Sequence, residues 1–255
     1  MTSASPLSRF APILFAILQI LIPMLPQLGL GEPIGERSDN VDTLITPAGW
    51  AFSIWSVLYA GSVLFAIYQA LPAQRDNPLL VQIRWPAAGA FAGNAVWAMY
   101  TQSEGLSAVS SAIILFTLVC LLLIYRRFAE WPRAFSAGER WCAFVPLSAL
   151  ASWLTVATLV NVSASLRFHG VEVGDAAPMA AAGVVIVGGV IAALALLRGR
   201  GNLPYALVFL WGLAAIFAEG GQTATLVAMA AVVAGLLVVA GAILGWRRAE
   251  PRSSL

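Results

Sequence analysis

Long apolar segments separated by short polar stretches run along almost the whole chain. Most of these segments approach the roughly 20 residues that a helix needs to cross the hydrocarbon core of a bilayer. In lipid, only helices and closed barrels satisfy every backbone polar group. The segments lie at residues 10–28, 50–71, 85–101, 106–125, 141–166, 178–197, 204–218 and 224–246. The pattern predicts an all-α fold, a polytopic transmembrane bundle of about eight helices.

The composition supports a membrane protein and argues against a soluble enzyme. Of the 255 residues, 60% are hydrophobic and only 10% are charged, and the mean hydropathy is +0.85. Soluble domains average about 25% charged residues, so this inventory is too small to cover a water-facing surface. The first segment is followed by no small-residue cleavage site, and we expect it to be a retained helix. The lipid bilayer is therefore the first expected partner.

Arginine placement predicts the topology, because cytoplasmic loops accumulate basic residues. With eight crossings, one side of the membrane holds twelve of the fourteen arginines, and the other holds only Arg37 and Arg167. That second side receives eight carboxylates: Glu32, Glu36, Asp39, Asp42, Glu104, Glu172, Asp175 and Glu219. We expect a multi-pass protein of the cell (inner) membrane with both termini cytoplasmic. The net charge of +2 then reflects topology, and no nucleic-acid partner is expected.

The chain changes character after its fifth apolar segment. The first five segments are rich in Trp and Pro, whereas the last three are mostly Ala, Val, Leu and Gly. We therefore predict a five-helix membrane bundle over residues 1–168, followed by a three-helix membrane unit with a short cytoplasmic tail over residues 169–255. The longest stretch between segments, residues 29–47, is rich in loop-forming residues. It is a candidate lid over the outer mouth of the bundle.

The sequence offers little for catalysis or metal binding. His169 is the single histidine and falls in a predicted outer loop. No Cys or His spacing of the zinc type is present, and no Asp or Glu lies deep within a predicted span. We expect no catalytic residues, no metal and no certain cofactor, so an enzyme is the less favoured reading.

Aromatic and amide side chains within the spans are the best candidates for a ligand site. Phe52, Trp55 and Tyr59 form one stripe at helical spacing, and Asn94 shares a face with Trp97. Trp153, Ala157 and Asn161 are spaced four apart and stack along one side of a helix. An indole beside an alanine leaves a concave step that suits a flat hydrophobic small molecule. The alternatives are that the amides only join helices and that the rings only pack the bundle.

Three motifs resemble one known family. The run from Pro47 to Trp55, PAGWAFSIW, resembles the loop-to-second-helix motif of the TspO/MBR family, the tryptophan-rich sensory proteins and translocator proteins. The same family has an amide and a tryptophan on its third helix, matched by Asn94 and Trp97. Its fifth-helix pattern is matched by Pro146, Trp153, Ala157 and Asn161. The resemblance covers residues 10–166. Here Trp50 and Trp55 are five apart, whereas the family usually spaces them six apart.

The resemblance implies a five-helix bundle that binds porphyrins, haem or sterol-like molecules in a pocket open at the first loop, often as a homodimer. It implies that Trp153 and Ala157 line the pocket and that Trp50 and Phe52 close it from the first-loop side. Asn94 and Trp97 would be contributed by the third helix. A tetrapyrrole is thus a possible ligand. The last three segments are foreign to the five-helix form.

Three functions remain in competition. The leading hypothesis is a protein that binds a flat hydrophobic ligand such as a porphyrin, haem or a sterol-like molecule, with transport or sensing of that ligand as its further role. A membrane scaffold or regulator would instead dock a partner through small-residue helix faces, for which Gly241 and Gly245 are candidates. A porphyrin-degrading membrane enzyme is the third.

Overall fold

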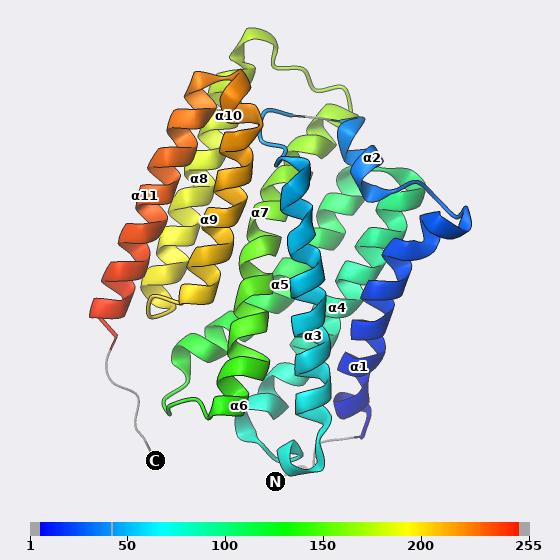
Figure 1. The fold of residues 1–255 in the computed structure, drawn as a ribbon, viewed down its shortest axis with the longest axis vertical. Coiled ribbons are helices and arrows are strands. Elements are labelled where there is room, and N and C mark those ends of the chain that lie inside the picture. The colour runs from blue at the N-terminus through cyan, green and yellow to red at the C-terminus, as the bar shows by residue number, and fades with distance from the viewer. Residues whose placement is uncertain (1–5, 42, 250–255) are drawn as a thin grey trace.

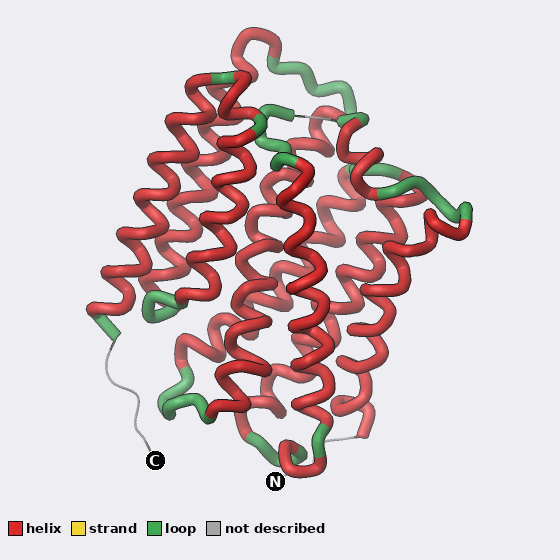
Figure 2. Tube along the Cα trace, in the orientation of Figure 1, coloured by secondary structure: helices red, strands yellow, loops and turns green. Residues whose placement is uncertain are grey.

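The computed structural model describes residues 6–41 and 43–249, and every regular element within them is a helix. Eight helical passes run side by side between two ends of the bundle, joined by short loops (Figures 1 and 2). The first four passes are α1 (Pro6–Leu21) with η1 (Ile22–Leu28), η2 (Gly49–Ser53) with α3 (Ile54–Ala70), α4 (Pro78–Glu104) and α5 (Ala108–Glu130). The last four are α6 (Ala137–Glu139), η4 (Arg140–Phe144) and α7 (Val145–Phe168); α8 (Ala177–Arg198); α9 (Leu203–Ala218) with α10 (Gly220–Thr223); and α11 (Thr225–Arg247). The loops carry the short elements α2 (Ile34–Asp39), η3 (Pro72–Gln74) and η5 (Gly174–Ala176).

Seven of the eight passes are long and apolar enough to cross a membrane. The exception is α4, which is 27 residues long but carries several polar side chains and packs between α1 and α5. It begins at Pro78 rather than at the predicted residue 85, because Asn77 caps its first turn by accepting hydrogen bonds from the backbone N–H groups of Leu79 and Leu80. The predicted polytopic all-α membrane bundle is confirmed.

The added first turns of α4 bring Arg84 into the helix and bury it completely. Its guanidinium donates hydrogen bonds to the backbone carbonyls of Gln69 (3.1 Å), Gln74 (2.8 Å) and Arg75 (3.0 Å), and to Gln69 Oε1 (2.9 Å). The last carbonyls of a helix lack partners within that helix. Arg84 supplies partners where α3 ends, so this buried charge holds the end of α3 against α4.

The helices fall into two groups. The first five passes form a closed ring in which α3 contacts α1, α1 contacts α4, α4 contacts α5, α5 contacts α7 and α7 returns to α3. The last three passes, α8, α9 and α11, pack on one another and meet the ring mainly where α9 lies against α7. The first described residues of α1 and the last of α11 lie at the same end of the bundle (Figure 1), as an even number of crossings requires.

Several glycines within the helical passes are used for packing within the chain. A side chain at Gly241 would come within 2.7 Å of the Cα atom of Ala193, where α11 crosses α8. A side chain at Gly93 would overlap Thr117 Oγ1 on α5. These small residues let helix backbones approach closely. Gly93 and Gly241 are therefore used for contacts between helices of this chain.

Candidate functional site

An aromatic cavity lies between α3, α4 and α7 and under the first loop, residues 29–47. These segments meet at the upper end of the ring in Figure 1. The outer chamber of the cavity encloses about 460 Å³, and a narrower inner chamber adds about 50 Å³ between the ring helices. Both chambers are lined by Ile34, Pro47, Phe52, Trp55 and Trp97. Tyr59 lines only the outer chamber, whereas Trp153, Ala157 and Asn161 line only the inner one. Seven of the nine predicted site residues therefore meet at one cavity.

Trp55 lies at the centre of the aromatic wall. Its indole stacks on that of Trp97 with ring centroids 6.5 Å apart and planes 24° apart. It meets Trp153 edge-on at 6.1 Å, and Tyr59 lies one helical turn away at 5.0 Å. Phe52 also meets Trp153 edge-on, at 6.3 Å. These edge-to-face and offset contacts are the arrangements that aromatic rings prefer, so the wall is held in place before any ligand enters.

Two of the lining indoles have buried donors without acceptors. Trp97 and Trp153 are only 7% and 2% exposed. Neither Nε1–H has a hydrogen-bond partner within the described chain. A buried donor left unpaired costs about 1–3 kcal/mol. Because both indoles line the cavity, these unpaired donors are candidate contacts for a bound molecule.

Ala157 and Asn161 lie one and two turns beyond Trp153 on α7. The small side chain of Ala157 leaves the inner chamber open beside the indole. Asn161 Oδ1 accepts hydrogen bonds from Ser110 and Ser111, each at 3.0 Å, and so ties α7 to α5. The amide of Asn161 thus joins two helices and also forms part of the cavity wall. The sequence had left both of these roles open.

The remaining two predicted residues, Asn94 and Trp50, do not line the cavity. Asn94 is buried on α4 and donates to Gln19 Oε1 on α1 at 3.2 Å. Trp50 is 48% exposed and packs edge-on against Trp211, with ring centroids 4.8 Å apart. Asn94 joins two helices of the ring, and Trp50 joins the first loop to α9.

The first loop covers the cavity. Ile34 of α2 and Pro47 line both chambers. The loop is attached to the end of α4, where the Glu32 N–H donates to the Gln102 carbonyl at 3.0 Å. Arg37 donates to the same carbonyl at 3.2 Å and forms an ion pair with Glu32 at 3.0 Å. The candidate lid is therefore anchored across the mouth.

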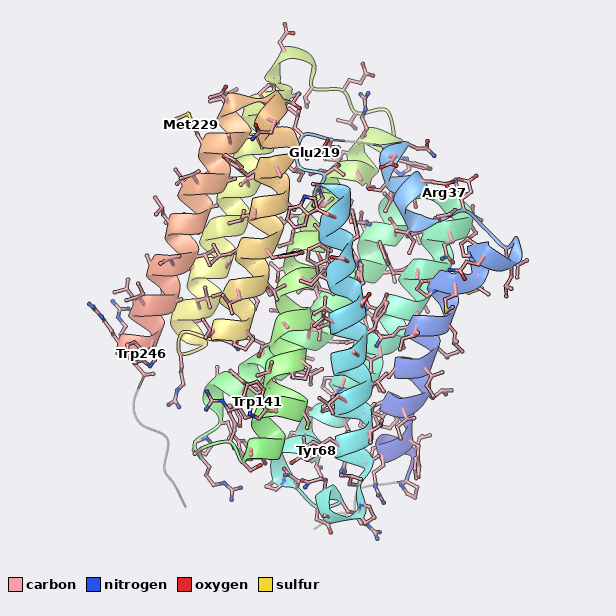
Figure 3. The ribbon with its side chains drawn as sticks, in the orientation of Figure 1. Arg37, Tyr68, Trp141, Glu219, Met229 and Trp246 are labelled. Carbon is pink, nitrogen blue, oxygen red and sulfur yellow. The ribbon has the colours of Figure 1, made fainter. Side chains whose placement is uncertain are left out.

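The last three helices reach the same site. Trp211 of α9 donates its indole N–H to the Ala51 carbonyl at 3.1 Å, and the Ala48 N–H donates to the Ala215 carbonyl at 3.2 Å. Glu219, at the end of α9, lines the outer chamber together with Asp39 of α2. Figure 3 shows Glu219 at the upper end of the bundle, near the start of α3. Sequence reasoning placed both carboxylates on the outer side but could not bring them to the cavity.

A larger depression of about 620 Å³ lies on the other side of the first loop, between the end of α7 and the start of α8. Its walls are mostly small aliphatic side chains, with no aromatic ring. Arg167 and Glu172 are the charged side chains among its described lining residues, and they form an ion pair with each other at 3.3 Å. No buried unpaired donor lies in its walls, so the aromatic cavity remains the stronger candidate.

Comparison with known proteins identifies a family for this chain. No curated protein and no solved structure matches the chain. A family model described as TSPO-like protein matches residues 9–244. The match confirms the resemblance drawn from the aromatic motifs, and it runs through all eight helical passes rather than ending after the fifth. This chain belongs to the family of TSPO-like proteins.

Proposed function

We propose that this membrane protein binds a flat hydrophobic small molecule in the aromatic cavity, of the size of a porphyrin, haem or a sterol-like molecule. The observation that carries the proposal is the pair of buried indole donors, on Trp97 and Trp153, that have no partner among the described residues. A chamber of about 460 Å³ lies within the usual range of ligand pockets, roughly 300–1,000 Å³. Its walls of aromatic rings with a few polar groups have the general form of such a site.

The geometry favours entry from the outer end, with the ligand body directed between α4 and α7. The outer chamber opens under the first loop, and the inner chamber continues it past Trp55 toward Ala157. Because the inner chamber holds only about 50 Å³, a larger side chain at Ala157 would close it. The same substitution leaves the outer chamber and its rim unchanged.

Quenching of tryptophan fluorescence tests the proposal. Purified protein in detergent would be titrated with protoporphyrin and with haem, and we expect saturable quenching. Ala157→Leu should weaken binding about tenfold, and Trp153→Phe should weaken it while removing one of the quenched indoles. Trp246→Phe is the matched control, because Trp246 is 73% exposed and lies at the opposite end of the bundle from Glu219 (Figure 3). Quenching that never saturates in the unmodified protein would refute a tetrapyrrole ligand.

We also propose that the end of the bundle that carries the first loop faces away from the cytoplasm and that both termini are cytoplasmic. The basis is the arginine distribution, because cytoplasmic loops accumulate basic residues. In a cysteine-free background, Glu172→Cys should react with an impermeant thiol reagent in intact cells. Ser136→Cys should react only after permeabilisation. The reverse pattern would invert the topology.

A further inference from the structure

The outer chamber combines aromatic rings with negative charge. Its rings are Phe52, Trp55, Tyr59 and Trp97, and the charged residues among its described lining are Asp39 and Glu219. No Arg, Lys or His is among the described residues that line it. Aromatic faces attract cations through the ring quadrupole, and cages of such rings bind quaternary ammonium groups. Carboxylates at the rim add a direct electrostatic attraction for the same charge.

The two rim carboxylates come from distant parts of the chain. Asp39 ends α2 in the first loop, and Glu219 follows α9 in the last group of helices. Neither carboxylate makes a hydrogen bond or an ion pair within residues 6–41 and 43–249. Both are exposed at the mouth, so they remain available to an entering ligand.

Nearby cations are already engaged. Arg37 lies on the same short helix as Asp39, but its guanidinium pairs with Glu32 and donates to the carbonyls of Gln102 and Ser103 at 3.2 and 3.0 Å. Arg167, the other arginine expected on this side, pairs with Glu172. The predicted outer side thus carries eight carboxylates against two arginines. A field of that sign concentrates cations and repels anions near the mouth.

From this geometry we infer that the ligand is an amphiphilic organic cation: a flat apolar body with an amine or quaternary ammonium group at one end. The inference rests on the proposed function, because it assigns a charge to the ligand of that same cavity. The ammonium group lies in the outer chamber between the aromatic faces and the rim carboxylates. The flat body extends toward the inner chamber, which the indoles of Trp97 and Trp153 line. Propionates of an anionic porphyrin find no cationic partner among the described residues of this rim, so a tetrapyrrole should bind in the cavity less tightly than a flat cation of similar size.

Three matched probes test the charge of the ligand. Pyrenebutyl-trimethylammonium, pyrenebutanol and pyrenebutyrate share one flat ring and one linker and differ in the charge of the end group. Each would be titrated into the full-length protein in an uncharged detergent, with quenching of tryptophan fluorescence as the readout and protein-free micelles as the blank. We expect the cationic probe to bind most tightly and the anionic probe most weakly.

Substitutions at the rim identify the carboxylates responsible. The double variant Asp39→Asn/Glu219→Gln should lose the preference for the cationic probe, by up to about fivefold for each carboxylate, which is the upper limit for an exposed ion pair. Glu36→Gln is the matched control, because Glu36 lies on the same α2 helix but does not line the chamber. Raising the salt concentration should also reduce the preference, since exposed charges are screened.

The outcomes separate the two proposals. A cationic preference that the double variant loses and Glu36→Gln keeps supports the inference. Equal binding of all three probes, tighter binding of pyrenebutyrate, or a preference that survives the double substitution would overturn it and leave the aromatic cavity as a binding site. No saturable binding of any probe would overturn the inference, and the titration with protoporphyrin and haem would then decide the proposed function separately. Unchanged melting temperatures of the variants would show that they fold, as expected for exposed side chains.

Discussion

The indole N–H of Trp211 donates a hydrogen bond to the backbone carbonyl of Ala51, 160 residues away in sequence, at 3.1 Å. This contact joins α9 to the η2 segment that carries Phe52, one of the rings of the aromatic cavity. The edge-on packing of Trp50 on Trp211 reinforces it. The helices that follow the ring of the first five passes therefore help to position the site as well as to extend the bundle.

Trp211→Phe should loosen this connection. The phenyl ring keeps an edge contact with Trp50 but cannot donate to the Ala51 carbonyl. We expect a loss of about 1 kcal/mol in the free energy of unfolding, the typical value of one hydrogen bond. Ligand affinity should fall by up to about fivefold, because the Phe52 wall is less well held. Thermal unfolding in detergent and ligand titration measure the two effects, with Trp246→Phe as the control. Unchanged values for both would show that α9 does not support the site.

Arg84→Gln should destabilise the bundle strongly. The substitution removes the donors for the carbonyls of Gln69, Gln74 and Arg75 at a fully buried position. Each buried group left without a partner costs about 1–3 kcal/mol, so we expect a total loss of at least 2 kcal/mol. Denaturation in mixed detergent micelles would measure it. Arg75→Gln, at an exposed position, should change stability by no more than about 0.5 kcal/mol. Similar losses in both variants would contradict the role assigned to Arg84.

Gly93→Ala should push α4 away from α5. A Cβ atom at this position would overlap Thr117 Oγ1, and overpacking of this kind typically costs about 1–3 kcal/mol. Gly183→Ala is the matched control, since nothing lies within 4 Å of a Cβ atom there. The control should leave the protein as stable as before or slightly more stable, because alanine is the better helix former. Equal effects of the two substitutions would mean that the backbones of α4 and α5 do not pack as closely at Gly93 as in the structure.

Asn161→Ala separates the structural role of this amide from a role in binding. The change removes the acceptor of Ser110 and Ser111, and interhelical hydrogen bonds in membranes contribute about 0.6 to 1.7 kcal/mol each. We expect lower stability in detergent with about a threefold change in ligand affinity. The double variant Ser110→Ala/Ser111→Ala removes the same bonds without touching the cavity wall.

Comparing these two variants is decisive for the amide. If both lose the same stability but only Asn161→Ala loses affinity, the amide contacts the ligand directly. If affinity falls equally in both, Asn161 acts by joining α7 to α5.

Much of the fold was predictable because the membrane imposes local rules. A span must be long and apolar, and the basic residues that flank the spans gather on the cytoplasmic side of the membrane. Seven of the eight passes obey these rules in the structure. The eighth, α4, was found from its apolar second half, but its first turns were missed. Arg84 is charged and directly precedes the predicted span, so the sequence indicates a loop residue. Its burial depends on carbonyl groups at the end of another helix.

The aromatic faces of the site were also predictable from the sequence. Which residues of those faces reach the cavity was not. Helical spacing alone brings Trp55 and Tyr59 to one face of α3, and Trp153 and Ala157 to one face of α7. Spacing does not say which neighbouring helix a face meets. Asn94 shares a stripe with Trp97, yet only Trp97 reaches the cavity, because Asn94 faces Gln19 on α1.

The sequence by itself determined that most of the chain is surrounded by lipid, how many helical passes it makes and which helix faces carry its aromatic residues. Each of these follows from the local order of apolar and polar side chains. Only the tertiary structure decided that the first loop closes over those faces and that Asp39 and Glu219 meet at one rim. The physical reason is that contacts between helices depend on how each helix is rotated and which neighbour it packs against. Those choices are set by close packing across the whole bundle, which the periodicity of a single segment does not encode.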